Sequence, residues 1–272
     1  SYNLVGDIGG TNARFALVSA GSSELNNIES LKCNKFDNIQ KAISFYLSSM
    51  EDTKIHSACF ATAGTVHLDT FKLANNHWTI NKSEVTSVLK DVDINWINDF
   101  TAQALATTTL TDSDVAVINK GIAKPEKLRL VIGPGTGLGV CGLVMTKSGW
   151  VPIAGEGGHS DFAPNTKLEF EILTLLTKKF GHVAVERILS GPGILNLYEA
   201  LCQINGVDII FKSPSDITVA AVSKDSNPIA EETIEMFCKI FGSVAGSMAL
   251  TIGALGGVYI TSDLVRNFLE LF

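Results

Sequence analysis

Two strand-like apolar runs flank the turn Asp7-Ile8-Gly9-Gly10-Thr11-Asn12, and two more flank the turn Gly133-Pro134-Gly135-Thr136-Gly137-Leu138-Gly139. Either turn alone is typical of a tight hairpin. The repetition indicates more, because the pattern of strand, glycine-threonine turn and return strand occurs near the N-terminus and again in mid-chain. We therefore predict a duplicated α/β unit whose two turns hold one polyphosphate.

Glycine is the residue type that phosphate binding needs in such turns. A side chain would keep phosphate oxygens away from the backbone N–H donors, and we expect some of these glycines to take positive φ. Thr11 and Thr136 add hydroxyl donors. Residues 133–139 do not fit the dinucleotide-binding fingerprint, because their glycines occupy every second position and a strand-like run follows them. The chain also contains no P-loop motif.

Composition and charge limit the class of protein. The chain has 272 residues, 46% of them hydrophobic and 18% charged, which suits two domains or one large α/β unit. A net charge of -7 and the lack of a Lys/Arg-rich run argue against nucleic acid as a partner. The 5 cysteines include no Cys-x-x-Cys pair, so neither a disulfide framework nor a cysteine zinc site is indicated. We expect a reducing, cytoplasmic location.

Residues 240–260 carry no charge and contain Gly242 and Gly246 at the spacing of a membrane helix-dimer motif. We favour a buried helix followed by a strand, because glycines at 253, 256 and 257 interrupt the run. The start of the chain has no basic segment followed by an apolar stretch, so no secretory signal is predicted. We expect no membrane partner.

Strand and helix patterns alternate along the chain. The first half predicts strands over 4–7, 14–18, 57–63 and 95–98, and helices over 39–49, 82–89 and 101–108, with Asn81 and Glu84 as a cap. The polar segment 109–114 then suggests a boundary between a domain of residues 1–110 and a domain of residues 111–272. The second half predicts strands over 127–132 and 140–145, and helices over 168–180, 194–204 and 229–255.

Two polar positions lie where ligands bind in α/β folds. Asn98-Asp99 stands between a strand and a helix, and from position alone Asp99 is equally a helix cap or a catalytic group. The turn Gly155-Glu156-Gly157-Gly158-His159-Ser160-Asp161 has small residues that would let Glu156 and His159 reach one ligand. Its alternative is a solvated loop with a structural histidine. No cysteine cluster accompanies His159, so we assign no zinc.

Five motifs, in order over nearly the whole chain, resemble those of the bacterial ATP-dependent glucokinases. They are Asp7-Ile8-Gly9-Gly10-Thr11-Asn12-Ala13-Arg14, Ile97-Asn98-Asp99-Phe100, Gly133 to Gly139, Gly155-Glu156-Gly157-Gly158-His159 and Glu186-Arg187-Ile188-Leu189-Ser190-Gly191-Pro192-Gly193. The resemblance implies a two-domain actin/hexokinase-like (ribonuclease H-like) α/β fold with a ligand cleft between the domains. The related repressor and sugar-kinase family carries a cysteine-rich zinc motif, and its absence here indicates the zinc-free branch.

The resemblance also implies roles for individual residues. Asp99 would be the general base that takes the proton from the glucose 6-hydroxyl as this attacks the γ-phosphorus of ATP. Glucose would be bound by Asp99 together with Asn98, Gly137, Glu156, His159 and Glu186. ATP would be bound by Gly6, Asp7, Ile8, Gly9, Gly10, Thr11, Asn12, Gly135 and Thr136, with Asp7 orienting Mg²⁺. The implied assembly is a homodimer.

Two features depart from the family pattern. Family members have a Gly-Gly pair after the strand that corresponds to residues 258–260, whereas this chain has Ser262-Asp263. A carboxylate beside ATP phosphates would be repulsive unless a metal or a backbone shift intervenes. Family members also continue beyond the position of Phe272 with a segment that returns to the first domain, so we expect further residues there.

Two other functions fit parts of the pattern. A non-catalytic sugar sensor on a kinase fold would control a partner through domain closure, but the retention of Asp99 argues against it. A nucleotide-hydrolysing switch of the same superfamily would leave Glu156, His159 and Glu186 without a role. Dependence of ATP turnover on added sugar distinguishes the three functions.

Overall fold

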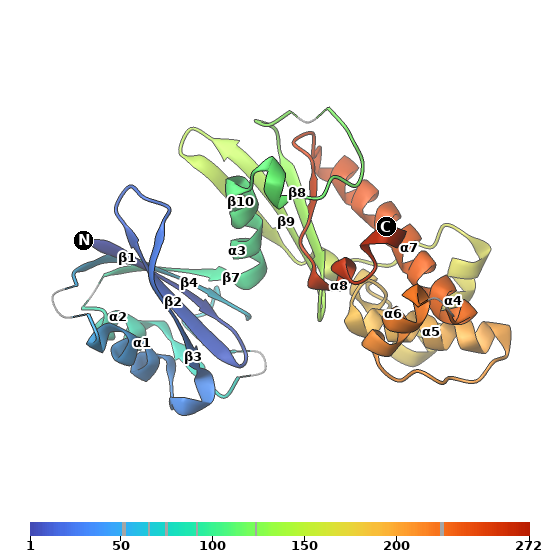
Figure 1. Cartoon of the computed structure of the whole chain (residues 1–272), viewed down its shortest axis with the longest axis horizontal. Coiled ribbons are helices and arrows are strands. Elements are labelled where there is room, and N and C mark those ends of the chain that lie inside the picture. The colour runs from blue at the N-terminus through green and yellow to red at the C-terminus, as the bar shows by residue number, and fades with distance from the viewer. Residues whose placement is uncertain (51–52, 65, 74–75, 91, 123, 224–225) are drawn as a thin grey trace. The chain divides into compact units, whose positions relative to one another are not determined.

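The computed structural model of the chain describes residues 1–272 except 51–52, 65, 74–75, 91, 123 and 224–225. The chain divides into two compact units, Ser1–Gln103 (unit 1) and Ala104–Phe272 (unit 2) (Figure 1). Each unit has its own sheet and its own cluster of buried hydrophobic side chains. Helix α3 (Asp99–Ala106) begins in unit 1 and ends in unit 2.

The sheet of unit 1 has the strand order β3-β2-β1-β4-β7. Its strands are β1 (Tyr2–Ile8), β2 (Asn12–Ser19), β3 (Leu25–Lys32), β4 (Ile55–Thr62) and β7 (Asp93–Asn98). The first three form an antiparallel meander, whereas β4 and β7 run parallel to β1. Parallel strands end at the same edge of a sheet, and Ile8, Thr62 and Asn98 stand in one register row across that edge.

Helices α1 (Ile39–Ser48) and α2 (Lys82–Val88) lie side by side along one face of this sheet (Figure 1). Tyr46 of α1 and Val85 of α2 are fully buried in the same cluster as Phe15 of β2. The predicted cap of the second helix is confirmed, because Asn81 accepts a hydrogen bond from the Glu84 N–H. The remaining elements of unit 1 are the short hairpin of β5 (Thr70–Lys72) and β6 (Thr79–Asn81) and the 3₁₀ turn η1 (Cys33–Lys35).

The sheet of unit 2 has the order β10-β9-β8-β11. Its strands are β8 (Arg129–Pro134), β9 (Leu138–Thr146), β10 (Gly149–Gly155) and β11 (Val258–Ile260). An antiparallel meander is again followed by one parallel strand, because β11 pairs parallel to β8. This order repeats β3-β2-β1-β4 of unit 1, as the predicted duplication requires. The sequence did not indicate β3, β5, β6 or β10.

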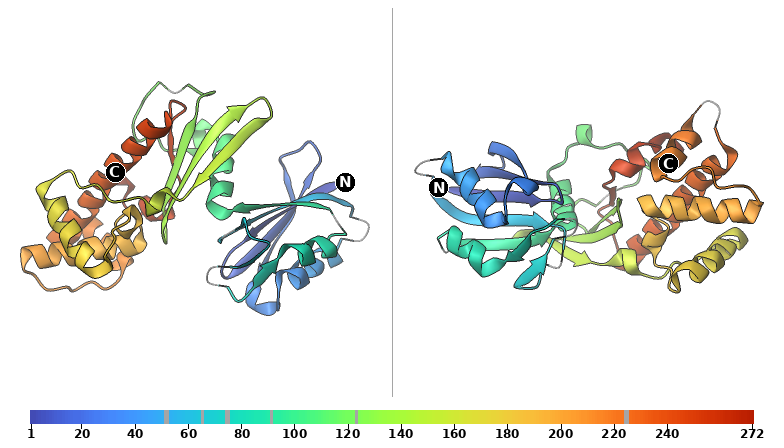
Figure 2. Two further views of the ribbon diagram at one scale, coloured as in Figure 1. Left: turned by 180° about the vertical axis from the view of Figure 1, so that it is seen from behind. Right: turned by 90° about the horizontal axis from the view of Figure 1, so that it is seen from below.

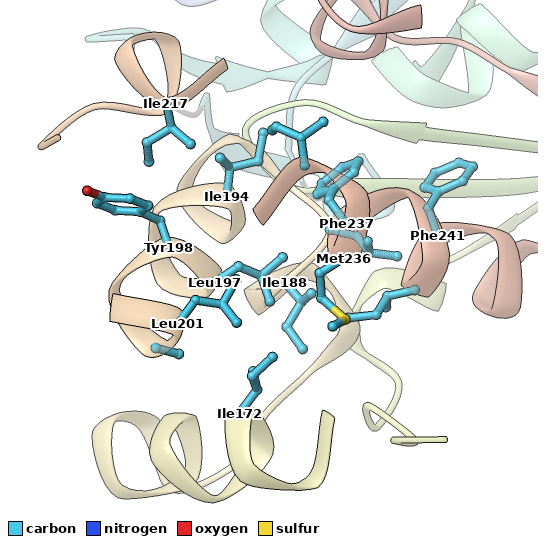
Figure 3. Close-up of a cluster of buried hydrophobic side chains, with 14 of the residues drawn as sticks. Ile172, Ile188, Ile194, Leu197, Tyr198, Leu201, Ile217, Met236, Phe237 and Phe241 are labelled. Atoms are coloured by element: carbon cyan, nitrogen blue, oxygen red, sulfur yellow. The ribbon is translucent and has the colours of Figure 1, made fainter. Parts of the chain in front are cut away.

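Helices α4 (Lys167–Phe180), α5 (Gly191–Asn205), α6 (Pro214–Val222) and α7 (Pro228–Ile252) pack around the large core of unit 2 (Figures 2 and 3). In this core Ile172, Leu197 and Phe237 come from α4, α5 and α7. Helix α8 (Asp263–Arg266) and the 3₁₀ turns η2 (Thr107–Thr109), η3 (Asp112–Asp114), η4 (Gly157–His159), η5 (Val185–Arg187) and η6 (Leu269–Leu271) complete the unit.

Helix α7 is long and apolar enough to cross a membrane by length and composition. In the structure one side of it belongs to the core of unit 2, where Ile234, Phe237 and Phe241 are buried. It ends three residues before the predicted position, because Gly253 takes the left-handed conformation with φ 68° and stops the helix. The core position accounts for the buried apolar residues of α7, which end at Ala245, whereas Leu250 near its C-terminal end is exposed.

Candidate active site

The first glycine turn joins β1 to β2 at the edge where the parallel strands of unit 1 end. Within it, the Gly9 N–H donates to the Asn12 carbonyl at 2.9 Å. The N–H groups of Gly10 and Thr11 donate to no other group among the described residues. Two adjacent free N–H donors in a glycine turn are suited to an anion. Gly6 precedes the turn within β1, where a Cβ would lie 2.6 Å from the Phe60 ring, so glycine there also serves close packing.

Asp7 and Arg14 face each other across the β1–β2 pair. Arg14 Nη1 lies 2.9 Å from Asp7 Oδ2, and both side chains are more than half exposed. This pair leaves Asp7 Oδ1 without a hydrogen bond to any described residue. The described residues contain no group of three or more His, Cys, Asp or Glu that could hold a metal ion. A metal here would therefore share its ligands with a bound phosphate, as Mg²⁺ often does.

Asn98 and Asp99 lie at the same edge of the sheet as the turn. Asn98 ends β7, two strands from β1, which corresponds to about 10 Å at the usual strand spacing. Asn98 Oδ1 accepts from the Phe100 N–H at 2.9 Å and the Thr101 N–H at 3.4 Å. Asp99 Oδ1 lies 2.8 Å from the Phe100 nitrogen. Asn98 thus shares the capping of α3, and both Asp99 Oδ2 and Asn98 Nδ2 are left for a ligand.

The second glycine turn joins β8 to β9, and three hydrogen bonds stabilise it. The Gly135 N–H donates to the Gly137 carbonyl at 2.8 Å, inside the turn. The Gly191 N–H, at the start of α5, donates to the Gly135 carbonyl at 2.8 Å. The Ser262 hydroxyl donates to the Pro134 carbonyl at 2.6 Å. Gly135 and Thr136 are exposed at the tip of this turn.

Glu156, His159, Glu186 and Gly137 are brought together in unit 2. His159 Nδ1 lies 3.4 Å from Glu186 Oε1, and His159 Nε2 lies 3.8 Å from Glu156 Oε2. The 3₁₀ turns η4 and η5 that carry His159 and Glu186 are joined by a hydrogen bond from the Val185 N–H to the Ser160 carbonyl. Glu186 is the most enclosed of the three side chains at 24% exposure, against 62% for His159 and 86% for Glu156. Three polar side chains thus form an accessible cluster.

The expectation of positive φ in the two turns is wrong. The described glycines with positive φ lie elsewhere, and none belongs to residues 9–10 or 133–139. Close approach explains the glycines near the cluster instead. A Cβ on Gly137 would lie 2.9 Å from Glu186 Oε2, and one on Gly158 would lie 2.3 Å from the Leu138 carbonyl oxygen. The missing side chain at 137 lets the Glu186 carboxylate rest against the second turn.

Ser262 and Asn76 contact the two turns, and the sequence assigned neither of them a supporting role. Ser262 caps α8 by accepting from the Val265 N–H at 3.1 Å. Asp263 is exposed and lies 3.4 Å from Arg266. A serine directly before an acidic residue is a helix-start signal and could have revealed the cap. Asn76 donates to the Gly9 carbonyl from 67 residues away, which no local pattern reports.

Comparisons with known proteins confirm the resemblance. The Glucokinase family model matches residues 4–272. A glucokinase of Hahella chejuensis is 49% identical over 271 residues, which are 100% of this chain and 84% of the relative. The crystal structure of a glucokinase from an Antarctic psychrotroph, 34% identical, superposes with a TM-score of 0.90 over 99% of this chain and 85% of its own.

A glucokinase of Balamuthia mandrillaris, solved in complex with glucose, matches with a TM-score of 0.71. Its sequence is 21% identical, and the match covers 99% of this chain and 82% of the Balamuthia chain. At this identity the match is evidence for the fold alone. With the 0.90 superposition, it confirms the predicted two-domain α/β fold class.

Proposed function

The chain belongs to the glucokinase family and is a hexose kinase, and we propose that it transfers the γ-phosphoryl group of ATP to the 6-hydroxyl of glucose, with Asp99 as general base. The products are glucose 6-phosphate and ADP. The observation that carries the residue assignment is the placement of Asp99 at the sheet edge that also bears the first glycine turn. Asp99 Oδ2 makes no hydrogen bond to a described residue, so it is free to accept the proton of a hydroxyl.

The sugar-binding role is assigned to Asn98 and Asp99 of unit 1 and to Glu156, His159 and Glu186 of unit 2. The cluster of Glu156, His159 and Glu186 supports this assignment. The two nitrogens of the imidazole lie 3.4 Å and 3.8 Å from the two carboxylates, so the three side chains can together pair with several hydroxyl groups. Gly137 contributes a backbone contact. A site whose polar groups are left unpaired by a deoxy or epimeric sugar rejects that sugar.

The nucleotide-binding role is assigned to the two glycine turns. The residues that take part are Gly6 within β1, then Asp7, Ile8, Gly9, Gly10, Thr11 and Asn12 of the first turn, and Gly135 and Thr136 of the second turn. The free N–H groups of Gly10 and Thr11 support the first assignment. Because charge spreads over the transferred oxygens in the transition state, fixed N–H donors contribute to catalysis by positioning and electrostatic stabilisation.

Mg²⁺ is proposed as the metal that accompanies ATP. The half-exposed Asp7 carboxylate, with Oδ1 unused by Arg14, suits a hard cation that keeps several waters and phosphate oxygens as ligands. The metal supplies neutralisation of the phosphate charge when it is bound. Asp7 would orient the ion, and Arg14, whose Nη1 lies 2.9 Å from Asp7 Oδ2, would hold the carboxylate in place.

Three further expectations accompany this function. We propose functional domains of residues 1–110 and 111–272, a homodimer and a cytoplasmic location. Limited proteolysis checks the boundary at residue 110, because a linker there would be cut first. Light scattering of the purified protein checks the dimer, and fractionation of the native cells checks the location.

The test of the proposed function is ADP release with Mg²⁺-ATP and a panel of hexoses, for the wild type and Asp99→Asn. Asparagine keeps an Oδ1 for the Phe100 N–H but cannot take the proton, so we expect intact glucose binding and a loss of kcat of about 100-fold or more. Asp112→Asn, in the exposed turn η3, is the matched control and should retain activity.

Glucose-dependent turnover that is lost in Asp99→Asn supports the kinase with Asp99 as base. Glucose binding without any ADP release would favour the non-catalytic sensor. ADP release that ignores added sugar would favour the nucleotide-hydrolysing switch. Equal kcat in Asp99→Asn and the wild type would refute the role of Asp99 alone.

A further inference from the structure

The peptide groups of the first glycine turn are held by residues far away in sequence. Asn76 Nδ2 donates to the Gly9 carbonyl at 3.0 Å, and the Cys33 Sγ lies 3.7 Å from the same oxygen. The Cys33 N–H donates to the Thr11 carbonyl at 2.9 Å. Burial raises the pKa of the Cys33 thiol, so that it stays protonated and able to donate at neutral pH. The turn is therefore clamped at Gly9 and at Thr11.

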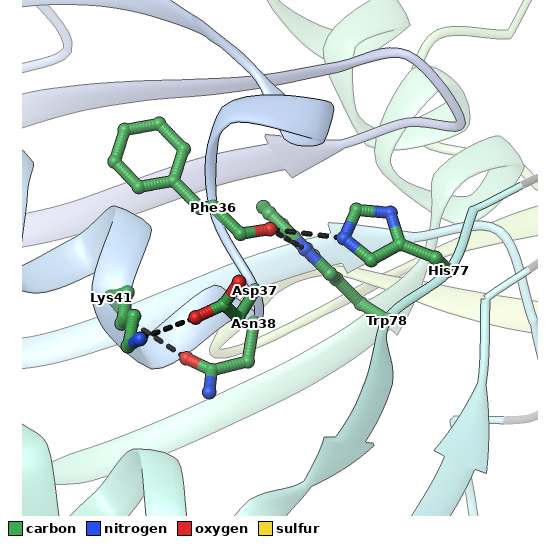
Figure 4. A network of polar contacts seen from close by, with 6 residues as sticks. All are labelled: Phe36, Asp37, Asn38, Lys41, His77 and Trp78. Carbon is green, nitrogen blue, oxygen red and sulfur yellow. Dashed lines mark hydrogen bonds and ion pairs between the residues drawn. The ribbon is translucent and has the colours of Figure 1, made fainter.

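The Asn76 carboxamide has a fixed orientation. The Trp78 N–H donates to Asn76 Oδ1 at 2.9 Å, so the opposite end of the amide must present its NH₂ group to Gly9. Trp78 is fully buried, and its indole N–H donates to the Phe36 carbonyl at 2.9 Å. His77 Nε2 lies 2.9 Å from that same carbonyl oxygen (Figure 4). Asn76 is thus anchored to the backbone of a fully buried residue.

The hydrogen bonds around Asn76, Trp78, Phe36 and Cys33 form a closed ring, called the circuit below. Phe36 follows the 3₁₀ turn η1, and its N–H donates to the Cys33 carbonyl at 3.1 Å. The chain of contacts runs from Gly9 through Asn76 and Trp78 to Phe36, and back through Cys33 to Gly9. A cavity of about 530 Å³ opens beside it, lined by the turn residues Gly10 and Thr11 and by Asn76 and Lys72 among others. Residues of the turn and Asn76 therefore border one space that a ligand can enter.

The geometry of a trans peptide links this circuit to the ligand side of the turn. The C=O and N–H of one peptide point in opposite directions, so holding the Gly9 carbonyl on Asn76 directs the Gly10 N–H away from Asn76. That N–H donates to no described group. Glycine peptides rotate more freely than others, so the Gly9–Gly10 peptide depends on an external hold.

We propose that Asn76 is a positioning residue that sets the orientation of the Gly9–Gly10 peptide and thereby presents the Gly10 N–H to a phosphate of the nucleotide. This inference rests on the nucleotide-binding role proposed for the turn. It does not require Asn76 to touch the nucleotide. Its consequence is confined to nucleotide affinity and to kcat, and sugar affinity is unaffected.

The experiment compares Asn76→Asp, Asn76→Leu and Asn38→Ala with the wild type. Aspartate keeps the acceptor for the Trp78 N–H and loses the donor to Gly9, whereas leucine loses both without adding a charge. Asn38 caps α1 in the same unit, where it accepts from the Lys41 N–H, and it does not contact the turn. Asn38→Ala therefore reports a stability loss without a change at the turn. Calorimetry measures the affinities for AMP-PNP and for glucose separately, and ADP release gives kcat.

Both Asn76 variants should weaken AMP-PNP binding and lower kcat/KM for ATP by about tenfold or more, because misplacing one donor affects binding and reaction alike. Glucose affinity should stay within about twofold of the wild type in both. Asn38→Ala should lower the melting temperature and leave the AMP-PNP affinity, the glucose affinity and kcat/KM for ATP unchanged.

The inference is overturned if Asn76→Leu binds AMP-PNP as the wild type does, or if glucose affinity falls as much as nucleotide affinity. If the wild type binds AMP-PNP but never phosphorylates glucose, the proposed function is refuted. The inference on Asn76 is then still tested by the AMP-PNP affinities of the Asn76 variants and the wild type. If an Asn76 variant fails to fold, the other variant supplies the comparison. If neither folds, Asn76 is a structural residue and the inference fails.

Discussion

The side-chain hydroxyl of Ser262 donates to the backbone carbonyl of Pro134 at 2.6 Å, across 128 residues of sequence. The same oxygen accepts from the Val265 N–H and starts helix α8. One hydroxyl thus connects the end of β11 to the second glycine turn. Ser262 therefore takes part in two hydrogen bonds, and the neighbouring Asp263 is exposed and close to Arg266.

Ser262→Ala should lower nucleotide affinity as well as stability. Loss of the cap costs about 1 kcal/mol in the free energy of unfolding. Loss of the Pro134 contact should in addition raise KM for ATP several-fold, because the second turn loses one of its supports. Ser213→Ala is the matched control, since Ser213 caps α6 in the same way without contacting the turn. Equal KM values for ATP in both variants would show that Ser262 is only a cap.

Gly137→Ala should displace Glu186. A Cβ at 137 would lie 2.9 Å from Glu186 Oε2, so the carboxylate must move, with a cost of about 1–3 kcal/mol if the backbone moves too. We expect KM for glucose to rise and KM for ATP to change less. Gly135→Ala is the stability comparison, because a Cβ at 135 would point into open space, with nothing within 4 Å. Wild-type KM for glucose in Gly137→Ala would contradict the proposed sugar-binding role of Glu186.

Glu186→Gln tests the polar cluster directly. Glutamine keeps the shape of the side chain but replaces one acceptor oxygen with a donor, next to His159 at 3.4 Å. Hydrogen bonds to a charged group contribute about 1.5–3 kcal/mol, so glucose affinity should fall by about tenfold or more. The control is Glu171→Gln on the surface of α4. Calorimetric titration with glucose measures both, and equal affinities would remove Glu186 from the site.

Stability should fall between pH 10 and pH 12 because of Tyr46. Burial raises the pKa of this phenol to about 12 from an ordinary value of 10. The phenol also donates to the Asn27 carbonyl at 2.8 Å. Above pH 10 the unfolded chain loses the Tyr46 proton while the folded chain retains it, so the stability present below pH 10 is lost as pH rises through 12.

Tyr46→Phe removes this titration. Urea unfolding at about pH 9 and about pH 11 should show a smaller fall in the free energy of unfolding for the variant than for the wild type. At the lower pH the variant should be less stable, because the hydrogen bond to Asn27 is lost. An identical pH dependence in both proteins would show that Tyr46 does not titrate differently on folding.

The sequence predicted the buried strands and long helices well, and the peripheral strands poorly. Strands β1, β4 and β8 carry apolar runs that hydrophobic pattern reports directly. Strand β3 lies at the sheet edge and most of its side chains are exposed, so it has no apolar run. Strands β5 and β6 have 3 residues each, too few for any periodicity.

The candidate site was predicted where motifs are local and missed where contacts are distant. Glu156 and His159 belong to one short turn, and Asn98 and Asp99 are adjacent, so their residue types could be interpreted together. The contact of Asn76 with Gly9 depends on how a hairpin folds back onto the first turn. The expectation of positive φ failed for a related reason. Glycine at 137 is required by the nearby Glu186 carboxylate, which only the fold brings there.

The repeated strand order has a consequence for biosynthesis. In unit 1 the parallel strands β4 and β7 follow soon after the meander, and the sheet is complete once Asn98 has been synthesised. In unit 2 the meander must wait for β11, in which Val258 pairs with Leu130. Non-local pairing of this kind is slow to form. On the ribosome, unit 1 therefore folds first, while the meander of unit 2 keeps an open edge at β8 until β11 has emerged.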